Sequence, residues 1–247
     1  MTAAPLDGLA VVVAGASRGI GAACATACAA AGARSVALLA RDAAALDRVA
    51  ADVAAHGATT HVRLCDVTST ASIARAFGAL ERVDVLVNSA GTNRPGPFLD
   101  VDEPTFDALF ALNVRAAFFL AQAAARAMDR GGTIVTISSQ MGHVGAPDRT
   151  VYCATKHAVE GLTKAVAVEL AGRAIRAVTV APTFVRTALT AAQLDDPATG
   201  PALRAQIPCG RWATAEEVAA AVVFAASPAS GSLTGTSLVL DGGWTAR

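Results

Sequence analysis

The sequence predicts a single α/β domain in which a parallel β-sheet is covered by helices on both faces. Apolar, β-rich runs alternate along the chain with alanine-rich stretches. Most of these runs are apolar on consecutive residues, which is typical of strands that are buried on both faces. The stretches between them are about a dozen residues long or longer, the length that a right-handed crossover helix needs.

The apolar runs predict a doubly wound, mostly parallel sheet of seven strands. The expected strands are Leu9–Ala14, Ser35–Ala40, Thr60–Cys65, Val83–Asn88, Thr133–Ser138, Ala174–Val180 and Thr236–Leu240. Helix starts are marked by capping residues: Asp42 before 43–55, Thr68 and Ser69 before 71–80, and Thr214 before 215–226. Glu217 follows Thr214 at the spacing of a capping box.

The 247 residues show no internal repeat, linker or second domain, so one domain is expected over residues 1–247. The least regular segment is Thr187–Gly210, which contains Asp195-Asp196-Pro197, Gly200-Pro201 and Pro208. Irregular segments of this length inside a compact domain are often functional. We expect 187–210 to be a mobile lid over a substrate.

Composition excludes several classes of protein. Hydrophobic residues make up 53% of the chain and charged residues 16%, which is too apolar for a disordered protein. Twenty basic residues balance twenty acidic ones, so we expect neither nucleic acid nor an anionic membrane as a partner. The uncharged run from Val218 to Leu240 is broken by Ser227-Pro228 and Gly231, which predicts a helix, a loop and a strand rather than a membrane span.

The N-terminal residues and the cysteines favour a cytoplasmic protein. Residues 1–7 lack the basic stretch followed by an apolar one that marks a signal peptide. The five cysteines are an odd and scattered set that fits reduced core residues, and we expect no metal site. They are Cys24, Cys28, Cys65, Cys153 and Cys209.

A glycine-rich turn follows the first predicted strand. The segment 14–21 reads Ala-Gly-Ala-Ser-Arg-Gly-Ile-Gly and leads into an alanine-rich helix. Glycines at such a turn let the backbone approach a pyrophosphate that rests on the helix N-terminus. Because strand, turn and helix open a βαβ unit, the segment predicts a Rossmann-type dinucleotide site. The residues expected to bind it are Gly15, Ser17, Arg18, Gly19, Ile20 and Gly21.

The spacing of this turn, G-x-x-x-G-x-G, resembles the cofactor motif of the short-chain dehydrogenase/reductase family. Further segments resemble that family's motifs in order: Asp66, Asn88-Ser89-Ala90-Gly91, Asn113, Ser139, Tyr152 to Lys156 as YxxxK, and Asp241-Gly242-Gly243. The resemblance covers essentially the whole chain. It implies an NAD(P)-dependent oxidoreductase that transfers a hydride between nicotinamide and a carbonyl or secondary alcohol.

The YxxxK segment also makes chemical sense. Reducing a carbonyl requires a proton donor and stabilisation of developing charge, while the nicotinamide carries the hydride. Tyr152 is the only tyrosine, and its spacing to Lys156 puts both on one helix face. A free tyrosine has a pKa near 10, and lowering it by about three units needs roughly 4 kcal/mol. An ammonium group about 4 Å away can supply that, so we expect Lys156 to lower the pKa of Tyr152.

The resemblance implies roles for the other catalytic residues. Ser139 would polarise the substrate carbonyl; Ser138 is its neighbour, but the spacing to Tyr152 favours Ser139. Lys156 would also hold the nicotinamide ribose, and Asn113 would anchor a water that feeds protons to Lys156. Asp66 would contact the adenine ring. Further cofactor contacts are implied for Val67, Asn88, Ala90, Gly91, Tyr152, Pro182, Thr183, Val185 and Thr187.

One position departs from the family pattern near the nicotinamide. The family often has glycine where this chain has Thr183, so a side chain narrows that wall of the pocket. Thr187 matches a family threonine that often bonds the carboxamide. For the substrate side, the expected contacts are Gln140 and His143, which follow Ser139, and Phe184 and Leu189.

The end of the second strand favours NADP(H) over NAD(H). NAD-specific proteins usually have an acidic residue there, which accepts hydrogen bonds from the ribose hydroxyls and repels a 2′-phosphate. This chain has Ala40, followed by Arg41, whose guanidinium can bind a phosphate; Arg18 can approach it from the other side. Asp42 could oppose a phosphate, so NAD(H) is the alternative.

Two substrate classes fit the sequence, a 3-oxoacyl thioester and a sugar or polyol. A non-catalytic nucleotide-binding regulator on the same fold is the alternative function. The resemblance also implies a homotetramer that pairs the helices carrying Asn113 and Tyr152 and, separately, the C-terminal strands. Small residues on the expected helix 151–171 would permit close helix approach; they are Ala154, Ala158, Gly161 and Ala165.

Overall fold

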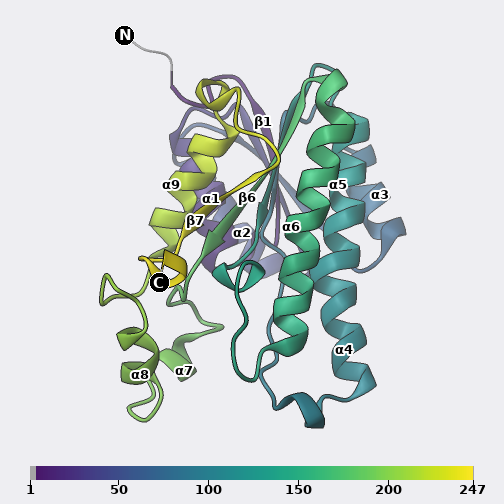
Figure 1. Cartoon of the computed structure of the whole chain (residues 1–247). Helices are drawn as coiled ribbons and strands as arrows, with labels where there is room; N and C mark the ends of the chain where they lie inside the picture. The colour runs from purple at the N-terminus through teal and green to yellow at the C-terminus, as the bar shows by residue number, and fades with distance from the viewer. Residues whose placement is uncertain (1–3, 247) are drawn as a thin grey trace.

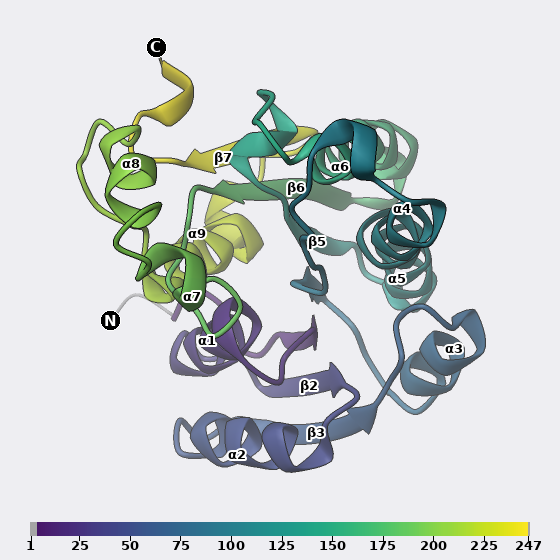
Figure 2. The same cartoon turned by 90° about the horizontal axis from the view of Figure 1, so that it is seen from below.

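The computed structural model describes residues 4–246; residues 1–3 of the N-terminal segment, and Arg247, lie outside the described residues. Its core is a seven-stranded sheet in the order β3-β2-β1-β4-β5-β6-β7, visible from one end in Figure 2. The strands are β1 Ala10–Ala14, β2 Ser35–Ala40, β3 Thr59–Leu64, β4 Val85–Asn88, β5 Gly132–Ile137, β6 Ile175–Pro182 and β7 Thr236–Leu240. The predicted α/β fold is confirmed, and every neighbouring pair of these strands is parallel.

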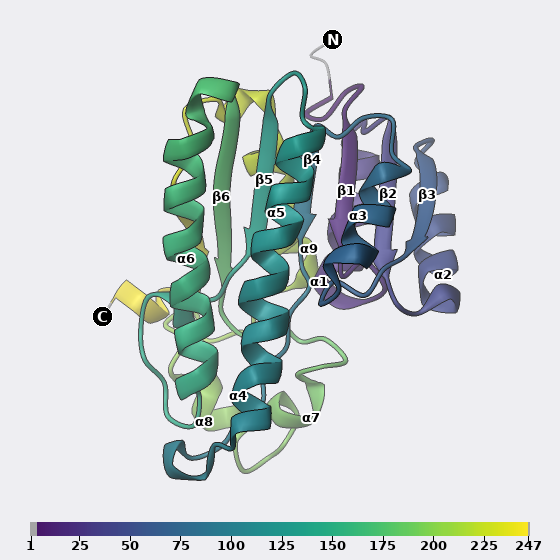
Figure 3. The same ribbon diagram turned by 90° about the vertical axis from the view of Figure 1, so that its right-hand side faces the viewer.

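Helices cover both faces of the sheet (Figures 1 and 3). One layer contains α1 Gly19–Ala30, α2 Ala43–Ala54 and α9 Ala215–Ala226. The other contains α3 Thr70–Gly78, α4 Glu103–Phe110, α5 Ala116–Ala127 and α6 Thr150–Leu170. Two short helices, α7 Ala191–Leu194 and α8 Gly200–Ala205, lie within the segment 187–210.

The predicted helix starts are confirmed by their capping hydrogen bonds. The Asp42 carboxylate accepts from the backbone N–H of Ala45 at 3.0 Å, and Ser69 caps α3 in the same way. Thr214 and Glu217 form the full capping box at the start of α9. These bonds satisfy N–H groups that have no partner inside the helix, so each helix begins where the sequence marks it.

The consecutive apolar residues of the strands supply both halves of the core. In β1, Val11 and Val13 pack with α1, α2 and α9, whereas Val12 and Ala14 pack with α3 and α5. Side chains alternate between the faces of a strand, and here both faces are covered. The alternation of apolar and polar residues that marks a strand with one exposed face is therefore absent from β1.

Strand order reverses between β1 and β4, because the chain moves outward to β2 and β3 before it returns to β4. Ligands bind outside the carboxyl ends of the strands at such a switch point. In Figure 1, α7 and α8 lie at this same end of the sheet. The fold therefore places the glycine turn, the ends of β4 to β6 and the segment 187–210 around one location.

Two apolar segments raise the question of a membrane. Residues 218–240 form the end of α9, a loop and β7, as the sequence predicts. The continuous helix Glu103–Ala127 is long and apolar enough to cross a membrane by those two criteria. Its residues Ala116, Leu120 and Ala124 are buried in the layer shared with α3 and α6, which is how a core helix packs.

Candidate active site

A cleft of about 180 Å³ opens at the carboxyl edge of the sheet. Three of the four predicted catalytic residues line it: Ser139, Tyr152 and Lys156. Seven other predicted cofactor residues line it as well: Ile20, Ala90, Gly91, Pro182, Thr183, Val185 and Thr187. Residues that are far apart in the sequence therefore meet at the switch point.

Tyr152 and Lys156 lie one turn apart on α6, as their spacing predicts. Lys156 is buried, and its ammonium lies 5.6 Å from the centroid of the Tyr152 ring. The same ammonium donates a hydrogen bond to the carbonyl oxygen of Ile137 at 2.9 Å. That bond joins α6 to the last residue of β5, two residues before Ser139.

The expected lowering of the tyrosine pKa is not found in this structure. Burial raises the pKa of Tyr152 to about 12, and a hydrogen bond with Ser139 lowers it only in part. Burial also lowers the pKa of Lys156 to about 8. The physical reason is desolvation, which disfavours the charged form of both groups. The Lys156 ammonium bonds the Ile137 carbonyl of β5 and not the phenol oxygen of Tyr152. Its charge therefore does not offset the desolvation that raises the pKa of Tyr152.

Ser139 follows β5 and begins a short 3₁₀ turn, 140–142. Its hydroxyl accepts a hydrogen bond from the Met141 backbone N–H at 3.1 Å and donates one to the Gln140 side chain at 3.0 Å. It also acts on Tyr152, because it lowers the pKa of that phenol. Ser138, the neighbouring alternative, lines the cleft too, but among residues 4–246 its buried hydroxyl has no hydrogen-bond partner. The effect of Ser139 on the pKa of Tyr152 supports the choice of Ser139.

Asn113 is buried in a π-helical turn, 111–115, between α4 and α5. Its side chain exchanges hydrogen bonds with the backbone of Thr92, at 2.9 Å in each direction, and donates to Thr155 at 3.1 Å. Single π-helical turns often occur at functional sites. The side chain thus joins the loop after β4 to α6 without lining the cleft, and its expected water-anchoring role stays a prediction.

The glycine turn fits a pyrophosphate. Gly15 and Gly19 have φ angles of +78° and +57°, which side chains rarely adopt. A Cβ atom on Gly21 would overlap the carbonyl oxygen of Gly15, so the turn requires glycine there. No side chain caps the N-terminus of α1, whose first N–H groups therefore face the space above the turn.

The nicotinamide end of the cleft also fits the expected cofactor. Thr183 is buried, and among residues 4–246 its hydroxyl has no hydrogen-bond partner although it lines the cleft. An unpartnered buried hydroxyl is costly, and a carboxamide could satisfy it. The Thr183 backbone N–H donates to Leu240 at 3.0 Å, and its φ is not positive, so the position does not require the usual glycine.

The adenosine end contains the charges expected from the sequence. Arg41 and Arg18 are both exposed beside the turn. Hydrogen bonds from Thr68 lower the pKa of the Asp66 carboxyl, and the charge of Arg41 lowers it further, so Arg41 and Asp66 lie at the same corner. The Asp42 carboxylate caps α2, which holds it at the start of that helix. Among the predicted cofactor residues here, Val67 is buried.

The comparisons with known proteins extend over nearly the whole chain. A family model described as enoyl-(acyl carrier protein) reductase matches residues 15–245. D-threitol dehydrogenase of Mycolicibacterium smegmatis is 39% identical over 98% of this chain and 95% of its own length. Galactitol 2-dehydrogenase (L-tagatose-forming) of Cereibacter sphaeroides is 40% identical over 97% of this chain and 96% of its own length.

A solved structure agrees with these relatives. The putative 2-deoxy-D-gluconate 3-dehydrogenase of Agrobacterium tumefaciens, with bound NADP, superposes with a TM-score of 0.93. It is 35% identical, and the match covers 100% of both chains. The chain belongs to the short-chain dehydrogenase/reductase family. It is an NAD(P)-dependent oxidoreductase of alcohol and carbonyl groups, and these relatives give no support to the non-catalytic alternative.

On the substrate side of this short-chain dehydrogenase/reductase, Gln140, Phe184 and Leu189 line the cleft, as the sequence suggests. Phe184 packs against two tryptophan rings, Trp212 at 6.0 Å and Trp244 at 5.9 Å between centroids. This aromatic cluster fixes one wall of the cleft at the base of the segment 187–210.

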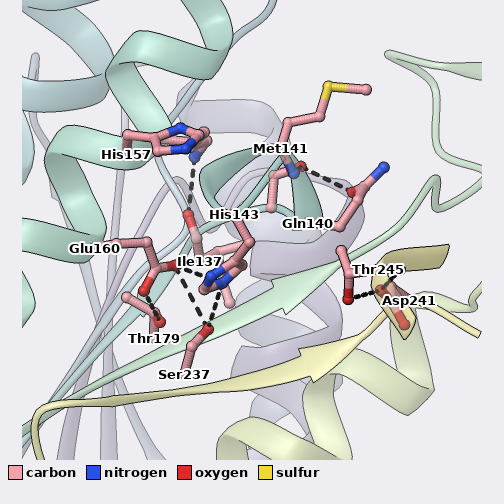
Figure 4. Close-up of polar contacts among 12 residues, drawn as sticks. Ile137, Gln140, Met141, His143, His157, Glu160, Thr179, Ser237, Asp241 and Thr245 are labelled. Carbon is pink, nitrogen blue, oxygen red and sulfur yellow. Dashed lines mark hydrogen bonds and ion pairs between the residues drawn. The ribbon is translucent and has the colours of Figure 1, made fainter. Parts of the chain in front are cut away.

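His143 lies elsewhere. Its imidazole contacts Ser237 of β7 at 3.2 Å and Glu160 of α6 at 3.5 Å, as Figure 4 shows, and it does not line the cleft. The turn after Ser139 directs the side chain of His143 toward β7, away from the cleft. The structure therefore does not bring His143 together with the other expected substrate contacts.

Several lining residues of this dehydrogenase/reductase were not anticipated from the sequence. They are Ser89, Thr92, Asn93, Met141, Thr190 and Gln193. Among residues 4–246, the buried side-chain oxygen of Asn93 (Oδ1) has no hydrogen-bond partner, so it is a candidate contact for a hydroxyl group. Its position just after the Asn88–Gly91 turn was the available signal. Gln193 lies on α7, within a segment whose sequence has no periodic pattern.

Residues 187–210 lie over the cleft. Thr187 reaches the glycine turn, because a Cβ atom on Gly19 would lie 3.4 Å from its methyl group. An exposed ion pair joins the segment to the residue just before it: Arg186 forms a bidentate ion pair with Asp195, at 2.7 and 3.0 Å.

Among residues 4–246, no group of three or more His, Cys, Asp or Glu residues could hold a metal ion.

Proposed function

We propose that this chain interconverts a secondary hydroxyl and the corresponding ketone of a small polyol or sugar, with NADP(H) as its coenzyme. The observation that carries the proposal is that Ser139, Tyr152 and Lys156 line one small cleft next to a glycine turn. The threitol and galactitol dehydrogenases that resemble the chain support the polyol class.

The bound coenzyme would supply the hydride acceptor for alcohol oxidation and the hydride donor for ketone reduction. In the oxidative direction, the substrate hydroxyl gives its proton to the oxygen of Tyr152. The Ser139 hydroxyl donates a hydrogen bond to the substrate oxygen, which becomes the carbonyl oxygen of the product. In reduction, Tyr152 returns the proton to that oxygen.

Lys156 and Asn113 support this proton transfer. A protonated Lys156 stabilises the tyrosinate that accepts the substrate proton during oxidation and that forms again when Tyr152 donates its proton during reduction. Its ammonium can also bind the nicotinamide ribose. Asn113 joins the loop after β4 to α6, and its π-helical turn would hold a water near Lys156. Thr183 and Thr187 would bind the carboxamide, and Asp66 the adenine.

The glycine turn and the corner at Arg41 support NADP(H) rather than NAD(H). Arg41 and Arg18 are exposed there, and the strand end has Ala40 in place of an acid. The Agrobacterium protein, of similar fold, binds NADP. The Asp42 carboxylate accepts a hydrogen bond from the Ala45 backbone, which holds it at the start of α2. Its negative charge is the feature at this corner that favours NAD(H).

A substrate panel tests the proposed function. With NADP⁺, the purified chain is expected to oxidise short polyols such as threitol and galactitol, and with NADPH to reduce the matching ketoses. The same assays with NAD(H) measure the coenzyme preference. The panel includes a 3-oxoacyl thioester, because the matching family model describes an acyl-thioester enzyme. A higher kcat/KM for the thioester than for every polyol would overturn the polyol assignment.

We also propose that residues 187–210 act as a lid that orders over the substrate. Its contact with the glycine turn and its place beside the cleft support this role.

A cytoplasmic location fits the five cysteines, all of which are free and four of which are buried. The expected partner is a small molecule, without nucleic acid or a membrane.

A homotetramer is the proposed assembly. Large apolar side chains are exposed on the elements expected to pair: Phe118 on α5, Val168 on α6 and Val239 on β7. Val168, which is 81% exposed, would be covered by the paired helices of such an assembly. Light scattering at micromolar concentration should give the mass of four chains, whereas the mass of one chain would contradict the proposal.

A further inference from the structure

Glu160 is a buried carboxylate next to the active site that the reaction scheme above does not use. It is 6% exposed and lies one helical turn beyond Lys156 on α6. Burying a carboxylate is costly unless hydrogen-bond donors and opposite charges compensate it. The surroundings of Glu160 should therefore show what stabilises its charge.

Donors from three elements converge on this carboxylate, as Figure 4 shows. Thr179 of β6 donates to Oε2 at 2.9 Å, and Ser237 of β7 donates to Oε1 at 3.5 Å. The imidazole of His143, from the loop that begins at Ser139, lies 3.5 Å from Oε1. Hydrogen bonds of this kind favour the charged form of a carboxylate.

The backbone of that same loop packs directly on Glu160. A Cβ atom on Gly142 would lie 3.1 Å from Cγ of Glu160 and 3.2 Å from the carbonyl oxygen of Lys156. Glycine at 142 therefore permits the close approach between the loop and α6. Glu160 is thus in contact with the loop that presents Ser139 and on the helix that presents Lys156.

Lys156 needs an opposite charge, because its ammonium is buried. Its near neighbours are the Tyr152 ring, the Ile137 carbonyl and, beyond Gly91, the Asn113 amide, none of which carries a negative charge when Tyr152 is protonated. Burial lowers the pKa of Lys156 to about 8, and the charge of Glu160 acts in the opposite direction. On a helix, residues four apart lie on one face, so Glu160 is on the same side of α6 as Lys156, although the two groups form no direct ion pair among residues 4–246.

We propose that Glu160 is a positioning residue of the active site, whose buried carboxylate is the counter-charge that keeps Lys156 protonated. The inference rests on the proposed role of Lys156 in proton transfer. Thr179, Ser237 and His143 hold the carboxylate in place. His143, which faces Glu160 from the loop, is the other titratable group beside it; His157 instead bonds the Cys153 carbonyl.

The composition of the chain makes the test direct. It contains two lysines, Lys156 and Lys164, both on α6, and Lys164 is exposed. Protein labelled with carbon-13 lysine therefore has two lysine side-chain signals. Their chemical shifts, followed against pH in the full-length protein without coenzyme, report both pKa values separately and need no substrate.

Glu160→Gln keeps the shape and the acceptor oxygen for Thr179 but removes the charge. The pKa of Lys156 is expected to fall by about one unit or more in this variant, because a buried opposite charge on the same face of the helix is lost. The pKa of Lys164 should not change. The matched control is Glu169→Gln, which removes an exposed carboxylate from the same helix, and it should leave Lys156 unchanged because solvent screens that charge.

Glu160→Asp is the second variant, because it retains the charge but shortens the side chain by one methylene. It should give a smaller fall in the pKa of Lys156 than the glutamine variant, and it carries the test alone if that variant does not fold. A Lys156 pKa that is the same in wild type, Glu160→Gln and Glu160→Asp would overturn the proposal, since a purely structural carboxylate would not move it.

The pH dependence of kcat separates this inference from the proposed function. If a protonated Lys156 is needed for turnover, the alkaline limb of the kcat profile shifts to lower pH in Glu160→Gln by the same amount as the Lys156 pKa. If the pKa moves and the kcat profile does not, Glu160 is still the counter-charge of Lys156, and the proposed role of Lys156 is wrong.

Discussion

Replacing Tyr152 with phenylalanine should lower kcat by at least about a hundredfold, the usual contribution of a general acid–base group. The substitution removes one oxygen atom and keeps the ring, which lies partly buried on α6. Without that oxygen, the proposed reaction has no group to accept the proton of the alcohol. Neither Ser139 nor Lys156 can replace it, because a serine hydroxyl is a much weaker acid and the Lys156 ammonium is bonded to Ile137.

The loss should appear in turnover and not in folding or coenzyme binding. Calorimetric titration with NADPH is expected to give a dissociation constant close to that of the wild type, and the melting temperature should change by no more than a surface substitution would cause. Near-normal kcat in the purified, folded variant would rule out Tyr152 as the proton donor and acceptor.

Replacing Arg41 with alanine should raise the KM for NADPH about tenfold or more, the loss of one charge-assisted contact of roughly 1.5–3 kcal/mol. The guanidinium lies near Asp66, which is in the loop after β3, and it follows the end of β2. A 2′-phosphate is present only on NADP(H), so the KM for NADH should barely change. The substitution therefore separates recognition of the phosphate from recognition of the rest of the coenzyme.

Arg48→Ala is the matched control for this prediction. It removes one exposed arginine from the second turn of α2, and it should leave both KM values unchanged because that residue lies beyond the end of β2, where the 2′-phosphate is expected. Equal increases in KM for both coenzymes after Arg41→Ala would contradict the proposal, and so would a wild-type preference for NADH.

The fold was predictable because its signals are local. Consecutive apolar residues mark strands covered on both faces, and capping residues such as Asp42 and Thr214 satisfy N–H groups within three residues of themselves. The expected and observed strand ends differ by at most two residues. Such differences arise because strand ends depend on pairing with a neighbour, which composition does not encode.

The candidate site was predictable where spacing alone brings groups together, as for Tyr152 and Lys156. The contacts of His143 were not, because they depend on the 3₁₀ turn after Ser139 and on β7, almost a hundred residues away. The sign of the Tyr152 pKa shift was also missed. A sequence shows which charges are near, but it does not show how completely a cleft removes water from a phenol.

The aromatic cluster at the base of the segment 187–210 gives the protein an intrinsic reporter. The chain has two tryptophans, Trp212 and Trp244, and both pack on Phe184, which lines the cleft. All of the indole fluorescence therefore originates from one corner of the active site. Because indole emission responds to the polarity of its surroundings, closure of the cleft over a substrate would change the emission of the unlabelled protein.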